Sequence, residues 1–312
     1  MRRLTLLALA AACLCSCARK TDADGRLRVV VTTFPAYDWT RVIMGAEADK
    51  AELTLLTDGG ADLHGYQPTV QDMAAIARAD VLVRTGGDSD DWTADALAST
   101  KNESARCVSL LAALDGRNKR NKIEETTAEA HEETEPDEHV WLSPKNAPAL
   151  CAAIADALCA ADGANARAYR ANLAAYTAEL AALDADYAAA TGAARTKTLV
   201  FGDRFPFRSL TDGYGLSYCA AFAGCSAETE ASFKTVAFLA GQVDALALPA
   251  VLHIETSDGA IARTVVQNTA AKSARVLMLD SMQAVTARRI AAGETYLGIM
   301  RKNLAVLQEA LE

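Results

Sequence analysis

The sequence predicts an α/β protein in which two βα lobes, each with a parallel sheet, are joined by one long rigid helix. Three observations support this fold class. Short β-branched strands alternate with helical segments up to about residue 111, and the same alternation restarts near residue 198. Between the two regions, residues 165–191 contain neither Gly nor Pro. Continuous apolar strands alternating with helices are typical of parallel sheets covered on both faces.

The first lobe is predicted to span residues 27–162. Its expected strands cover residues 27–34, 51–57, 81–84 and 106–111, and its expected helices cover 35–45, 68–78, a segment from Asp90, and 144–161. Pro35 and Pro68 suit first helical turns, where no backbone donor is needed. An acidic loop at about 117–138 interrupts the lobe. The linking helix is assigned to residues 163–193, longer than most globular helices.

The second lobe is predicted to span residues 194–312. Strands are expected at 198–201, 216–222, 250–255 and 276–280, with helices at 233–246, 261–270 and about 293–311. A chain of 312 residues, 51% of them hydrophobic, is long enough to bury the cores that two lobes need.

The first 26 residues are typical of an export signal followed by a tether. Arg2 and Arg3 precede a short apolar run that is too short to span a bilayer permanently. Residues 1–16 are predicted to be a lipoprotein signal peptide, with Cys17 as the lipid-modified residue and Cys13 as the alternative. Residues 17–26 would tether the protein to the outer side of the bacterial cytoplasmic membrane.

The charge and the cysteines exclude several functions. A net charge of −9 disfavours nucleic acid, because phosphate binding requires clustered Lys and Arg. The cysteines beyond the leader include no CxxC pair, which disfavours a thiolate zinc site. Cys219 and Cys225 would either form a disulfide or remain buried thiols. The protein is expected to act as a monomer.

Residues 124–144 change from an acidic, solvated run containing His131 to the sequence His139-Val140-Trp141-Leu142-Ser143-Pro144. The acidic part cannot bury enough apolar surface to fold alone. Ser143 is expected to cap a helix with Pro144 in its first turn. His139 would therefore lie between an anionic loop and a helix start, a suitable place to hold a cation.

The other candidate metal ligands lie at strand ends. His64 follows the second predicted strand, His253 lies at the end of the strand 250–255, and Asp280 ends the strand 276–280. Ligands of open α/β sheets bind beyond the carboxyl ends of the strands. Imidazole and carboxylate suit zinc, and also manganese or iron where more oxygen ligands are present.

Two motifs carry a resemblance to a known family. Residues 62–72, DLHGYQPTVQD, and residues 137–144, DEHVWLSP, resemble the two histidine motifs of the zinc/manganese solute-binding proteins of ABC importers. The resemblance covers essentially the whole mature chain. It implies two lobes joined by a rigid helix, one metal ion in the cleft between them, and delivery of that ion to an ABC importer permease.

The resemblance also implies a set of metal ligands. His64 and His139 match family ligands, and Asp280 matches the carboxylate ligand near the chain end. The third family ligand falls at Gly202, which has no side chain, so His253 is the proposed replacement. Other replacements would be Asp203, Glu228 or a water molecule.

Zinc is favoured as the transported ion, because zinc-carrying members often have a His- and acid-rich loop before the second motif. Residues 124–138 resemble a sparse version of it. The alternatives are a manganese- or iron-binding member of the same family, a secreted metallohydrolase with Glu255 as base, and a surface adhesin. The hydrolase is disfavoured because the chain has no H-E-x-x-H motif, so no catalytic residue is assigned.

Overall fold

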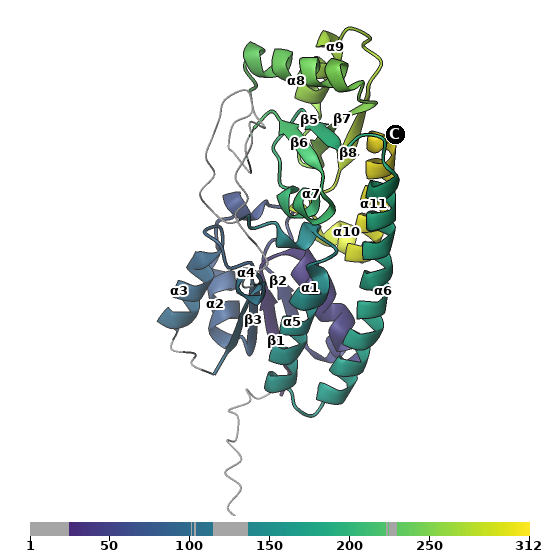
Figure 1. The fold of residues 1–312 in the computed structure, drawn as a ribbon. Coiled ribbons are helices and arrows are strands. Elements are labelled where there is room, and N and C mark those ends of the chain that lie inside the picture. The colour runs from purple at the N-terminus through teal and green to yellow at the C-terminus, as the bar shows by residue number, and fades with distance from the viewer. Residues whose placement is uncertain (1–24, 101, 103, 115–136, 223, 225–229) are drawn as a thin grey trace, which may run out of the picture.

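The structure is a computed structural model that describes most of the chain. The described residues are 25–100, 102, 104–114, 137–222, 224 and 230–312 (Figure 1). The predicted signal peptide, Cys13, Cys17, His131, Cys225, Glu228 and most of the acidic loop therefore lie outside the described residues.

The N-terminal lobe contains a fully parallel sheet in the order β2-β1-β3-β4. Its strands are β1 (Arg28–Val31), β2 (Glu52–Leu55), β3 (Val81–Arg84) and β4 (Arg106–Ser109). Its helices are α1 (Phe34–Met44), η1 (Gly45–Lys50), η2 (Leu63–Gly65), α2 (Val70–Arg78), α3 (Asp91–Ser99), α4 (Leu110–Ala113), η3 (Val140–Leu142) and α5 (Ala147–Ala161). The central strand β1 is buried on both faces, as its run of valines predicts.

The C-terminal lobe repeats this topology with the order β6-β5-β7-β8, again fully parallel. Its strands are β5 (Thr198–Phe201), β6 (Ser217–Ala220), β7 (Ala250–Ile254) and β8 (Arg275–Leu279). Its helices are α7 (Arg208–Tyr214), α8 (Phe233–Leu246), α9 (Ala260–Asn268), α10 (Ala287–Ala291) and α11 (Tyr296–Leu311). The predicted fold class, two βα lobes with parallel sheets, is confirmed.

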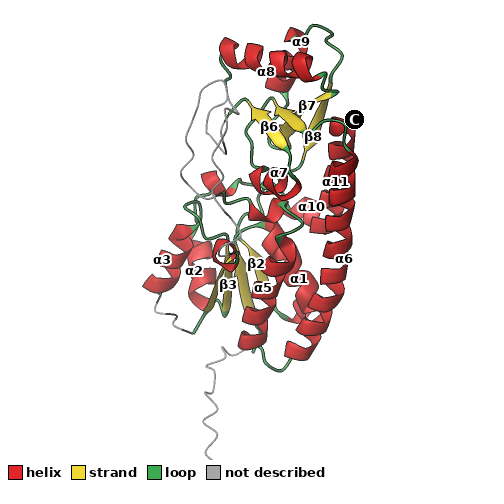
Figure 2. Cartoon of the chain, in the orientation of Figure 1, coloured by secondary structure: helices red, strands yellow, loops and turns green. Residues whose placement is uncertain are grey.

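The long helix α6 (Ala166–Ala193) runs along both lobes (Figures 1 and 2). It packs on α1 and α5 of the first lobe and on α7 and α11 of the second. The buried tyrosines Tyr169, Tyr176 and Tyr187 lie along its packed side, and Tyr187 Oη donates to the Met300 carbonyl oxygen at 2.7 Å. The helix therefore forms a spine that is anchored in both halves of the molecule.

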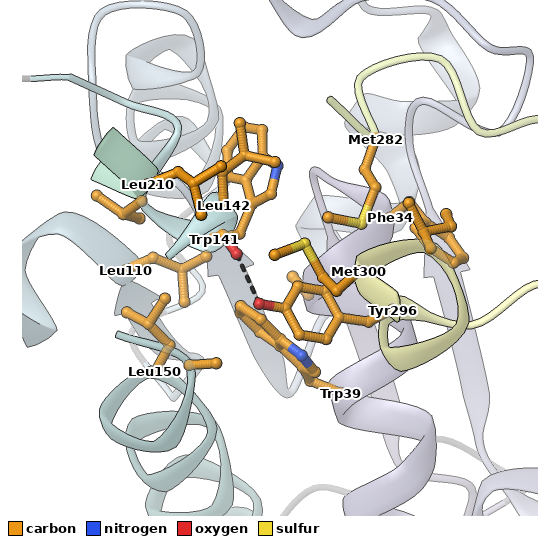
Figure 3. Packing of buried hydrophobic residues seen from close by; sticks show 14 of the residues in the cluster. Phe34, Trp39, Leu110, Trp141, Leu142, Leu150, Leu210, Met282, Tyr296 and Met300 are labelled. Carbon is orange, nitrogen blue, oxygen red and sulfur yellow. Dashed lines mark hydrogen bonds between the residues drawn. The ribbon is translucent and has the colours of Figure 1, made fainter. Parts of the chain in front are cut away.

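The two lobes also contact each other directly, in the buried cluster around Trp141 and Tyr296 (Figure 3). Tyr296 Oη donates to the Trp141 carbonyl oxygen at 2.8 Å, and Trp141 Nε1 donates to the Ser281 carbonyl oxygen at 3.0 Å. The Tyr296 backbone N donates to the buried Asp38 carboxylate at 2.8 Å. These contacts join α1 and η3 of the first lobe to the β8–α11 region of the second, within one continuous apolar core.

The structure differs from the sequence prediction at the start of α5 and before α11. Helix α5 begins at Ala147 rather than at Pro144, with Pro148 in its first turn. Ser143 has extended backbone, the conformation favoured before proline, and its carbonyl oxygen accepts from Asn146 N at 2.9 Å in a turn. The predicted last helix corresponds to α11, which Thr295 caps, and the short helix α10 before it was not predicted.

Candidate metal centre

His64 and His139 meet side chain to side chain. Their Nε2 atoms are 3.2 Å apart and their ring centroids 5.2 Å apart. His64 lies in η2 after β2, and His139 directly precedes η3. His139 is 4% exposed, whereas His64 is exposed, so one imidazole forms the floor of the site and the other forms its rim.

The same local turn presents both histidines. Asp62 Oδ1 accepts from His64 N at 3.1 Å, and Asp137 Oδ1 accepts from His139 N at 3.0 Å. An Asp side chain that accepts from the amide two residues later forms a tight turn without help from the rest of the fold. The repeated Asp-x-His spacing in both motifs was the sequence signal for these two aspartates, which the sequence analysis did not single out.

The far ring nitrogens are held by hydrogen bonds. His139 Nδ1 is 2.8 Å from Asp137 Oδ1, and His64 Nδ1 is 2.6 Å from Ser89 Oγ. Such contacts on Nδ1 fix the orientation of an imidazole and leave Nε2 to bind a cation. The Nε2 atoms of both rings are thereby aimed at one point.

Asp137 also connects the lobes. Its Oδ2 accepts from Ser209 N at 3.1 Å and from Ser209 Oγ at 2.9 Å, and Ser209 belongs to α7 of the second lobe. Burial alone would raise the pKa of this carboxyl, but the hydrogen bonds and charge of His139 and the Ser209 hydroxyl outweigh it, so the pKa lies below its usual range. The ionised carboxylate therefore orients His139 and holds the second lobe.

Asp280 and His253 contact other groups in this structure. The Asp280 carboxylate lies 2.6 Å from Arg289 Nη2 and accepts from Met282 N at 2.8 Å. His253 Nδ1 lies 3.0 Å from the Ile254 carbonyl oxygen. Within the described ranges, no group of three or more His, Cys, Asp or Glu side chains is arranged to hold a metal ion. The structure thus brings together two of the four predicted ligands, and the roles of Asp280 and His253 remain predictions.

Gly202 directly follows β5 and lies against helix α9. A Cβ at this position would lie 2.4 Å from Ala262 Cα and 2.5 Å from Ala262 N. Neighbouring Asp203 accepts from Ile254 N at 3.2 Å and from the Ser257 hydroxyl, so its carboxylate holds β7 rather than facing the histidines. The glycine is required for close packing of helix on sheet, and a side chain there would have no space.

Glu255 follows β7 and was the base considered for hydrolysis. Its carboxylate accepts from Ser281 N at 2.7 Å, Ser281 Oγ at 2.9 Å and Gln283 N at 3.1 Å. Burial, and then the charge of Asp280, raise its pKa. Glu255 therefore shapes the loop after β8, which runs beside the histidine pair.

Two matching parallel sheets, a helical spine and paired histidines define a two-lobed solute-binding protein. The profile of the ZnuA family, described as zinc-uptake complex component A, periplasmic, matches residues 29–310, so the chain belongs to this family. The family consists of solute-binding proteins and not of enzymes. In the part of the chain that the structure describes, no helix has the length and apolarity needed to cross a membrane.

Relatives and solved structures agree with the family. The zinc-binding lipoprotein AdcA of Streptococcus pneumoniae serotype 4 is 30% identical over 317 residues, covering 100% of this chain and 62% of AdcA. The crystal structure of the Zn(II)-bound ZnuA-like domain of S. pneumoniae AdcA has a TM-score of 0.74 at 27% identity, covering 92% of this chain and 99% of that domain. The metal-dependent lipoprotein YcdH of Bacillus subtilis has a TM-score of 0.75 at 26% identity, covering 92% of this chain and 100% of YcdH.

Proposed function

We propose that this protein captures zinc outside the cytoplasm and delivers it to the permease of an ABC-type importer. The observation that carries the proposal is the 3.2 Å separation of His64 Nε2 and His139 Nε2. Two nitrogens bound to one tetrahedral zinc at 2.0–2.1 Å lie about 3.3–3.4 Å apart. The two nitrogens therefore need to move apart only slightly to bind one zinc ion.

Membership of a family of zinc-uptake components supports the same proposal. Two imidazoles favour zinc over manganese, which prefers more oxygen. Manganese or iron is the alternative cargo. Asp280 and His253 remain the predicted ligands for the other coordination positions of the metal. Cys17 is the proposed lipid anchor, and the acidic loop before His139 is the proposed collector of ions.

The proposal is tested by titrating the metal-free chain from Ala18 onwards with zinc against a competing chelator, and then with manganese. We expect one zinc per chain, bound more tightly than manganese, together with a rise in melting temperature because ligand binding stabilises only the folded state. Absence of tight zinc binding would contradict the proposal. Tighter binding of manganese would favour the alternative cargo.

Asp137→Asn is expected to weaken zinc binding by about 10- to 100-fold, the usual effect of losing a partner behind a metal-bound histidine. An asparagine can offer its oxygen either to His139 or to Ser209 N, and its NH₂ group must face the other. Ser209→Ala is the matched variant, because it removes one hydroxyl donor and leaves the Asp137–His139 contact. Equal zinc affinities for wild type and Asp137→Asn in the chelator competition would show that Asp137 does not position the ligand.

A further inference from the structure

The loop after β8 carries a glutamine into the site. Gln283 is 8% exposed, and its backbone N is fixed by Glu255 Oε1 at 3.1 Å. The preceding residue, Met282, has a positive φ of 61°, a conformation that costs energy for a residue with a side chain. Met282 N is held in this conformation by Asp280 Oδ1. The strained turn directs Gln283 toward the first lobe.

Hydrogen bonding fixes the orientation of the Gln283 amide. With its nitrogen toward Asp62, it donates to both carboxylate oxygens, at 2.8 and 3.0 Å. Its oxygen then accepts from Ser281 Oγ at 3.2 Å and lies 3.3 Å from His139 Nε2. The opposite orientation would place the amide oxygen against a carboxylate, which can only accept when ionised. Asp62 thus turns the amide oxygen toward His139.

His139 Nε2 is the common neighbour of two other possible metal ligands, His64 Nε2 and Gln283 Oε1. His139 Nε2 lies 3.2 Å from His64 Nε2 and 3.3 Å from Gln283 Oε1. Neighbouring donors around a tetrahedral zinc have about this spacing. In the metal-free protein the amide oxygen accepts from a proton on His139 Nε2 at this distance. Zinc can take the place of that proton between the two atoms, because both offer it a lone pair once the proton leaves.

We propose that Gln283 supplies an oxygen ligand to the metal through Oε1, in place of the side chain missing at Gly202. Asp62 acts as its positioning residue, and Arg204, 3.5 Å from Asp62 Oδ2, supports that carboxylate from the second lobe. The metal would then join the lobes, with two imidazoles from the first and an amide oxygen from the second. This inference rests on the proposed function, because it names a ligand of the same ion.

The test is zinc competition with Gln283→Ala, using exposed Gln267→Ala on α9 as the matched control. We expect Gln283→Ala to lose about 10²-fold in zinc affinity, the lower end of what one of four zinc ligands contributes, and the control to lose none. A structure of the zinc complex is expected to place Oε1 within the roughly 2.0–2.2 Å of an oxygen ligand. The apo melting temperature serves to separate the loss of a ligand from a loss of stability.

The outcomes separate this inference from the proposed function. If Gln283→Ala binds zinc like wild type while His139→Ala does not, Gln283 is not a ligand and the function stands. If affinity falls but Oε1 is not bonded to zinc, Gln283 is only structural and the inference is wrong. If wild type does not bind zinc, the proposed function fails and this inference fails with it.

Discussion

His139→Ala is expected to lower zinc affinity by about 10²–10³-fold. Structural zinc sites release about 10–16 kcal/mol, or about 2.5–4 kcal/mol for each of four ligands. The loss is expected to reach the upper end of the range at this position, because His139 is buried and its removal leaves Asp137 without its imidazole partner. Chelator competition with the purified variant measures the effect.

His64→Ala and His253→Ala serve as comparisons for this prediction. His64 is exposed, and its Nδ1 contacts a serine hydroxyl rather than a carboxylate. His64→Ala is therefore expected to lower zinc affinity less than His139→Ala does. His253→Ala tests whether His253 is the predicted third imidazole ligand, because only the removal of a ligand would lower zinc affinity by a comparable factor. Unchanged zinc binding by His139→Ala would remove the central residue of the proposed function.

The fold was predictable because local patterns determine most of it. The valines of β1, the Gly- and Pro-free run of α6 and the strands that follow each helix specify parallel sheets and a spine without long-range information. Strand β3 and helix α8 have the predicted bounds. The predicted start of α5 was wrong because Ser143 has the extended backbone favoured before proline, and its carbonyl oxygen accepts from Asn146 N in a turn that precedes the helix.

The histidine pair was predictable from strand ends and motifs, whereas the surroundings of the other candidates were not. Arg289 reaches Asp280 from α10, a short helix that the sequence analysis did not predict. Gln283 is brought to His139 across 144 positions of sequence, by a loop whose shape depends on Glu255 and on one positive φ. Contacts of this kind depend on tertiary packing and leave no periodic signal in the sequence.

Gly202→Ala is expected to destabilise the protein by about 3 kcal/mol, which is the upper end of the usual range for overpacking in a core. Gly202→His is expected to destabilise it by more. A Cβ would lie 2.4 Å from the backbone of Ala262, which cannot move without shifting α9 from the sheet. Gly202 has no positive φ, so the requirement is space and not backbone conformation. Urea unfolding measures the change. Gly241→Ala on α8, where a Cβ meets nothing within 4 Å, is the matched control and is expected to gain about 0.5–1 kcal/mol.

The histidine variant has a second consequence for zinc binding. Restoring the residue type expected at this position is predicted to give no gain in zinc affinity, because the side chain has no space beside α9 and the sheet must open to admit it. A folded Gly202→His protein with wild-type stability and tighter zinc binding would contradict this account. It would mean that α9 can move aside and that the third family position is still usable. We expect instead that α9 can pack this closely only because residue 202 has no side chain. The third metal-ligand position must then be filled by a residue from another loop.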